Sequence, residues 1–67
     1  MNDGEIFDKA HSGVRNTIRF RDFFFDFLLP LGYQGSYLSA FNIAEKKGLI
    51  GADGSHGMVY YISKGSQ

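Results

Sequence analysis

Two carboxylates at helical spacing are the first candidates for chemistry. Asp22 and Asp26 stand four residues apart in the segment RDFFFDFLL, and a helix would place both on one face. Such a pair can share acid–base work or hold a metal ion. No His, Cys or third carboxylate accompanies them at ligand spacing, so a solvent-exposed helix face is the favoured interpretation. We therefore expect no metal site and no cofactor.

The two histidines and the nine glycines also lack the partners that catalysis requires. His11 and His56 lie in or near expected loops, and neither has a Ser, Cys or carboxylate arranged for nucleophilic catalysis. The glycines form neither a GxGxxG fingerprint nor a phosphate-binding loop. Gly51, Gly54 and Gly57 fit a hairpin instead. The chain is not expected to be an enzyme.

Length and composition predict one small domain over residues 1–67, with an ordered core of about 3–64. A domain of this size buries only about 60% of the surface of its unfolded chain. The 43% hydrophobic and 16% aromatic residues suit a dense core. No segment approaches the roughly 20 apolar residues of a membrane span, and the acidic start MNDGEIFD is not a signal peptide. We expect a cytoplasmic protein with no membrane partner.

Two helices are expected in the first half of the chain. Residues 3–11 carry an apolar stripe at helical spacing, with Asp3 as the capping residue. Residues 21–29 place most of their aromatic side chains on one face. Pro30 is expected to move Leu29 out of helical geometry and so end this second helix.

A third helix is expected from Ser36 to Lys47. Ser36 is a favourable N-cap, and Gly48 suits the position that follows a helix end. The residues expected to face inward are Tyr37, Ala40, Phe41 and Ala44. The residues expected to face outward are Ser39, Asn42, Ile43 and Lys46.

Strands are expected where apolar and polar residues alternate. Residues 16–20 fit a short strand, although a helix running through this segment is the alternative. Residues 49–51 and 58–63 are expected to form two further strands, joined by the loop 52–57 with its Asp-Gly turn signal. The expected fold is therefore α+β, with three helices and a C-terminal β-hairpin. Residues 64–67 are expected to fray.

The order of these elements resembles the winged helix-turn-helix family of DNA-binding domains. The most specific part is the spacing of Tyr37, Phe41 and Ala44 before Gly48-Leu49-Ile50. It is similar to the end of a recognition helix that leads into a β-hairpin wing. Asp53-Gly54 and the run Val59-Tyr60-Tyr61-Ile62 are similar to the turn and return strand of such a wing.

The resemblance implies a small sequence-reading protein that binds double-stranded DNA. The third helix would enter a major groove, and its polar side chains would meet base edges. Arginines near the second helix would hold phosphates, which positions the domain without specifying sequence. The residues assigned to this surface are Gln34, Ser36, Ser39, Asn42, Lys46, Arg19, Arg21 and, at the wing tip, His56. A transcriptional regulator, repressor or excision factor of a phage or mobile element is the class expected by analogy.

A protein-binding module with the same fold and no DNA partner is the alternative function. The formal net charge is zero, whereas a basic domain would point directly to nucleic acid. Several apolar side chains are not easily buried in so small a domain, and they could form a homodimer or a partner surface. These residues are Phe25, Leu29, Ile43 and Tyr61. An inhibitor of host machinery would belong to this class.

Overall fold

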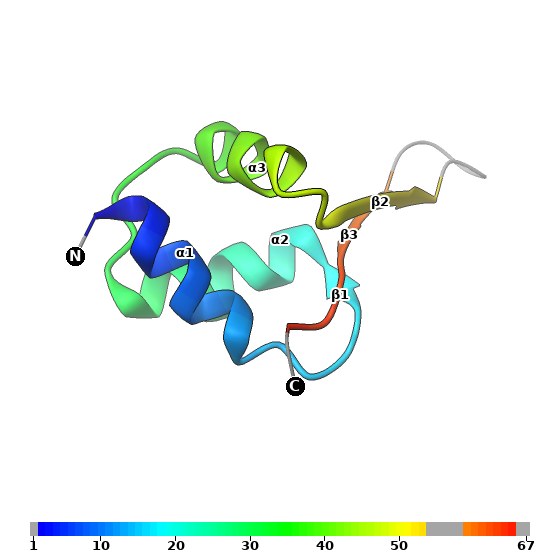
Figure 1. Ribbon diagram of the computed structural model, residues 1–67, viewed down its shortest axis with the longest axis horizontal. Helices are drawn as coiled ribbons and strands as arrows, with labels where there is room; N and C mark the ends of the chain where they lie inside the picture. The colour runs from blue at the N-terminus through cyan, green and yellow to red at the C-terminus, as the bar shows by residue number, and fades with distance from the viewer. Residues whose placement is uncertain (1, 54–58, 66–67) are drawn as a thin grey trace.

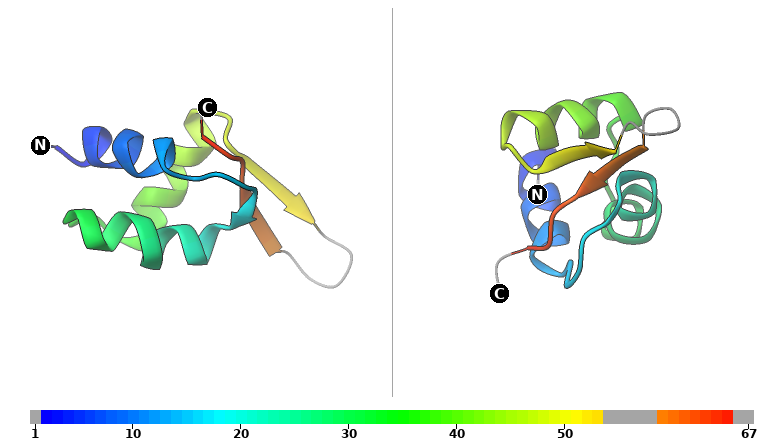
Figure 2. Two further views of the ribbon diagram at one scale, coloured as in Figure 1. Left: turned by 90° about the horizontal axis from the view of Figure 1, so that it is seen from below. Right: turned by 90° about the vertical axis from the view of Figure 1, so that its right-hand side faces the viewer.

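The computed structural model describes residues 2–53 and 59–65, which form a small α+β fold. Helical segments pack beside a three-stranded antiparallel sheet (Figure 1). Figure 2 shows that α1 and the second helical segment lie side by side, with the sheet at one end of this pair. The predicted α+β class is therefore confirmed.

The first helix, α1 (Asp3–Ser12), starts at the predicted residue, but its cap is a capping box at Asn2 and not the predicted Asp3. The Asn2 side chain accepts from the amide of Glu5 at 2.8 Å, and the Glu5 carboxylate accepts from the amide of Asn2 at 3.2 Å. This reciprocal pair requires Glu or Gln three residues after the cap. Glu5 meets that requirement for Asn2, so the capping residue is Asn2, one residue before the predicted one.

The second helical segment contains three kinds of helix in succession. It runs through α2 (Phe20–Phe23), a π-helix η1 (Phe24–Leu28) and a 3₁₀ helix η2 (Leu29–Leu31). It ends at Gly32, whose φ of +93° lies in the left-handed region that glycine adopts at little cost. The following residue, Tyr33, donates its amide to the Leu28 carbonyl oxygen at 3.2 Å.

The prediction that Pro30 ends this helix was wrong. Leu29 keeps helical angles, with φ −61° and ψ −43°, and its amide bonds to the Phe24 carbonyl five residues earlier. In an α-helix the Pro30 ring would clash with the carbonyl of Asp26, four residues before it. The wider π turn changes this spacing just before the proline, so the chain stays helical through Pro30.

The third helix, α3 (Tyr37–Lys46), has the predicted cap residues at both ends. The Ser36 side chain accepts from the amide of Ser39 at 3.0 Å. At the other end Gly48 has a φ of +71°. The amides of Gly48 and Leu49 donate back to carbonyls of the last turn, each at 3.0 Å, which is the Schellman arrangement. The chain then passes from α3 directly into the sheet.

The sheet has the strand order β1-β3-β2, with all neighbours antiparallel. Its strands are β1 (Ile18–Arg19), β2 (Ile50–Asp53) and β3 (Val59–Ile62). Ile62 is fully buried and lies opposite both Ile18 and Ile50. The segment 16–20 is therefore a strand for two residues only, because Phe20 already begins α2.

The core lies where the helical segments and the inner face of the sheet meet. Its largest fully buried side chains are Phe7, Phe20, Phe23, Leu28 and Ile62. Phe7 and Phe23 meet edge to face at 5.3 Å between ring centroids, a favourable geometry for aromatic pairs. Tyr33 also belongs to the core, with 4% of its surface exposed, although its sequence context predicted a turn.

The segment after β3 is tied to α1 rather than frayed, as far as Gly65. His11 donates from Nε2 to the Ser63 carbonyl oxygen at 2.8 Å, and Gly65 donates its amide to the Val14 carbonyl oxygen at 2.8 Å. Gly65 is buried against the backbone of α1. The prediction of a fraying tail was therefore wrong for this residue.

Candidate nucleic-acid interface

The solvent-facing side of α3 is an exposed helical surface. Four residues at helical spacing make up this face: Leu38, Asn42, Glu45 and Lys46. Asn42 and Lys46 were assigned to it from the sequence. Leu38 was missed, although it is 67% exposed, and so was Glu45. A full helical projection around Ala40 and Ala44, which are completely buried, would have identified both.

Three residues predicted for the outer surface of α3 have structural roles, although Ser36 is also exposed. Ser36 uses its hydroxyl to cap the helix. Ser39 is half-buried, and its Oγ lies 2.7 Å from the Tyr33 hydroxyl. Ile43 is also half-buried and packs against the core, so its predicted outward placement was wrong. The apolar face of α3 is wider than the stripe expected from the sequence.

Gln34 precedes α3 and is exposed, as a groove-reading residue would need to be. Its backbone amide lies 3.5 Å from Oδ1 of Asp3, which is at the limit of a hydrogen bond. This weak contact with Asp3 links the loop before α3 to α1. Gln34 lies two residues before Ser36, the N-cap of α3, so its exposed side chain belongs to the loop that leads into this helix.

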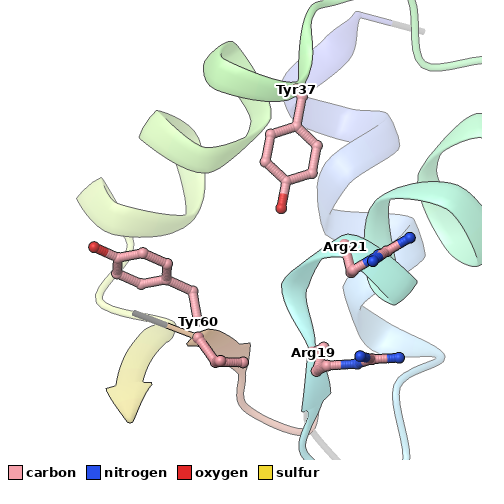
Figure 3. Close-up of a pocket in the computed structure, with 5 residues that line it drawn as sticks. Arg19, Arg21, Tyr37 and Tyr60 are labelled. Atoms are coloured by element: carbon pink, nitrogen blue, oxygen red, sulfur yellow. The ribbon is translucent and has the colours of Figure 1, made fainter. Parts of the chain in front are cut away.

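A surface hollow joins α3 to the arginines and to the sheet (Figure 3). Its volume is about 260 Å³, and its lining comes from β1, α2, α3 and β3. The lining residues are Arg19, Arg21, Tyr37, Val59 and Tyr60. The Tyr37 hydroxyl points into the space between Tyr60 and the arginines (Figure 3). No carboxylate lines this hollow within the described ranges, so its charged lining is cationic.

The two arginines of the hollow differ in their partners. Arg19 Nε lies 3.1 Å from Oδ2 of Asp22, with both side chains about half exposed. Such an exposed pair contributes on the order of 0–1 kcal/mol, so an incoming phosphate can compete for the guanidinium. Arg21 is exposed and makes no ion pair within residues 2–53 and 59–65. An anionic ligand can therefore bind Arg21 without displacing a carboxylate, whereas at Arg19 it must compete with Asp22.

The predicted apolar patch is only partly assembled. Phe25 is 55% exposed and Leu29 is 41% exposed, and they lie four residues apart on the second helical segment. Tyr61 is half-buried on β3, and Ile43 belongs to the edge of the core. Phe25 and Leu29 thus remain as an exposed pair without the other two. His56, assigned to the wing tip, lies outside the described residues.

The remaining sites considered from the sequence are simple surface features. Asp26 is exposed and Asp22 pairs with Arg19. In the part of the chain that the structure describes, no three His, Asp or Glu side chains gather as metal ligands would. None of the described helices is long and apolar enough to cross a membrane.

Comparisons with protein-family models, with curated proteins and with solved structures give no match to this chain.

Proposed function

We propose that this chain is a winged helix-turn-helix domain that binds double-stranded DNA through α3. The order of helices and strands and the sheet order β1-β3-β2 support this fold assignment. In this arrangement α3 corresponds to the recognition helix and the β2–β3 hairpin to the wing. The direct passage from α3 into β2 at Gly48 fixes the hairpin beside the helix.

One observation carries the functional proposal. The hollow brings Arg19 and Arg21 beside Tyr37, in the first turn of α3, and beside the strand β3. The first turn of a recognition helix lies closest to the base edges. Cations placed at its side are positioned to hold the phosphates that flank the groove.

The residues on this surface would divide the work between bases and backbone. Asn42 can bond bidentately to adenine, and Leu38 can contact a thymine methyl group. Lys46 and Arg21 would bind phosphates, and Gln34 would approach a base from the loop before α3. Binding of this kind without catalysis suits a regulator, such as a repressor or an excision factor.

The test is binding of the purified protein to random-sequence duplex DNA across a salt series, by fluorescence anisotropy. Each neutralised phosphate contributes about 0.9 to the slope of log K against log salt. Arg21→Gln is expected to reduce the slope by about 1. Lys9→Gln, which removes a cation from the exposed surface of α1, is the matched control and should leave the slope unchanged.

A protein-binding function is the second candidate, because of Leu38 and Phe25. Both are more than half exposed, and Phe25 lies one helical turn before Leu29, which is 41% exposed. Exposed apolar side chains that lie together mark protein contact sites. Absence of duplex binding even at low salt would favour this function over DNA binding. Leu38→Ser would then be the variant to test in capture of a protein partner.

A further inference from the structure

The hollow beside α3 is larger and more apolar than a phosphate contact requires. Its volume of about 260 Å³ equals that of several water molecules, at roughly 30 Å³ each. Three of its five lining residues are Tyr37, Val59 and Tyr60, which are 42%, 38% and 38% exposed. The bases of a duplex are stacked and paired, so a duplex offers these side chains little beyond deoxyribose. An unpaired base would present a ring face to them.

The two tyrosine rings are held in place by the core. Tyr60 meets Phe41 edge to face at 4.8 Å between ring centroids. Tyr37 meets Phe20 at 5.3 Å and Phe24 at 5.1 Å, also edge to face. Rings that are already ordered lose little conformational entropy when a ligand binds. They are suited to act as stacking surfaces.

The arginines that line the hollow can bind the phosphate of a nucleotide. Arg21 carries a guanidinium that makes no ion pair within the described residues, and Arg19 adds a second positive charge. A cationic rim that tracks the backbone, together with aromatic rings that stack on bases, is the usual composition of sites for single-stranded nucleic acid.

We infer that this hollow binds one unpaired nucleotide of a DNA strand. The base packs against Tyr60 and Val59, the Tyr37 hydroxyl bonds to the base or the sugar, and Arg21 binds the phosphate. This inference rests on the proposed contact with DNA and extends it from paired to unpaired strands. It predicts a preference for junctions, overhangs or locally opened duplex next to the site that α3 occupies.

The first test compares two single strands that carry the same phosphates. One is a hexamer of thymidine, and the other is a hexamer of abasic units. Stacking of one base is expected to make the thymidine strand bind about 5- to 150-fold more tightly. Tyr60→Leu should remove this difference, whereas Tyr61→Leu, on the same strand but outside the hollow, should keep it. Arg21→Gln should weaken both strands by the same factor.

The second test needs no substitution. The sequence has two valines: Val59 lines the hollow, and Val14 is buried in the core with 3% exposed. Selective labelling of valine methyl groups therefore gives one signal set at the site and one internal control. Ring currents of a bound base should shift the Val59 methyl signals in a titration with the thymidine hexamer and leave those of Val14 in place.

Each outcome decides a different point. Tight binding of the thymidine strand, lost in Tyr60→Leu, together with a Val59 shift, would support the inference. Equal binding of the two single strands, or an unchanged Val59 signal at saturation, would overturn it. Binding of duplex alone would overturn it while leaving the proposed duplex function intact. No binding of either form of DNA would refute both.

Discussion

Substitution of Gly65 by alanine tests the contact that fastens the end of β3 to α1. A methyl group at this position would collide with the backbone carbonyl of His11, with its carbon at 2.9 Å and its oxygen closer still. A flexible side chain could turn away, but these are backbone atoms within a helix. The variant must therefore release residues 63–65 from α1.

The cost of that release can be worked out from the bonds it breaks. Release loses the bond from the Gly65 amide to Val14 and the bond from His11 to Ser63, both 2.8 Å long. At about 0.5–1.5 kcal/mol each, together they set a ceiling of about 3 kcal/mol. His11 is only half-buried, and water can replace its partner, so about 1–2 kcal/mol is expected. For a domain of this size each kcal/mol lowers Tm by about 4–8 °C.

Thermal and urea unfolding followed by circular dichroism measure this cost. Gly51→Ala is the matched control, because a methyl group on that exposed strand residue meets nothing within 4 Å. A double variant with His11→Ala adds a second criterion, since two changes that release the same segment should be less than additive. Equal Tm values for Gly65→Ala and Gly51→Ala would refute the reasoning.

Four further changes follow from the packing and from the proposed interface. Tyr33→Phe removes the 2.7 Å bond to Ser39 and should lower the unfolding free energy by about 0.5–1.5 kcal/mol; a double-mutant cycle with Ser39→Ala in urea should recover this coupling, and zero coupling would contradict it. Leu28→Ala leaves a cavity at a fully buried position and should lower the unfolding free energy by about 2–5 kcal/mol. The thermal unfolding transition should then be much smaller, because less folded protein is present at its start. Gly48→Ala forces a side chain into a φ of +71° and should cost about 1 kcal/mol, with an unchanged Tm as the contrary result. Lys46→Ala should reduce the salt slope of duplex binding by about 0.9, and an unchanged slope would remove Lys46 from the interface.

Local rules were sufficient wherever a backbone conformation depends on its own neighbours. Ser36 and Gly48 were predicted as the two ends of α3 because capping uses groups within a few residues. The burial of Ala40 and Ala44 followed from helical spacing alone. The sequence also predicted that Asn42 and Lys46 lie on the exposed side of α3, and both are exposed in the structure. Their contact with DNA stays a prediction.

Non-local packing explains the parts that the sequence did not reveal. Tyr33 looks like a turn residue, yet its hydroxyl meets Ser39 across a half-buried contact. Gly65 looks like a free end, yet it fits against α1, far from it in the sequence. The hollow requires β1, α2, α3 and β3 to come together, and no spacing within one segment could have predicted it.

The π turn at Phe24–Leu28 makes the second helical segment sensitive to insertion and deletion. A π turn holds one residue more than the α turn it replaces. Deleting one residue there would restore an ordinary α-helix and would leave the later side chains close to their present orientation. It would also bring the Pro30 ring against the carbonyl of the residue four places before it, as in any α-helix with an internal proline. We therefore expect deletion of the exposed Phe25 to lower stability through Pro30, whereas substitutions of Phe25 should not.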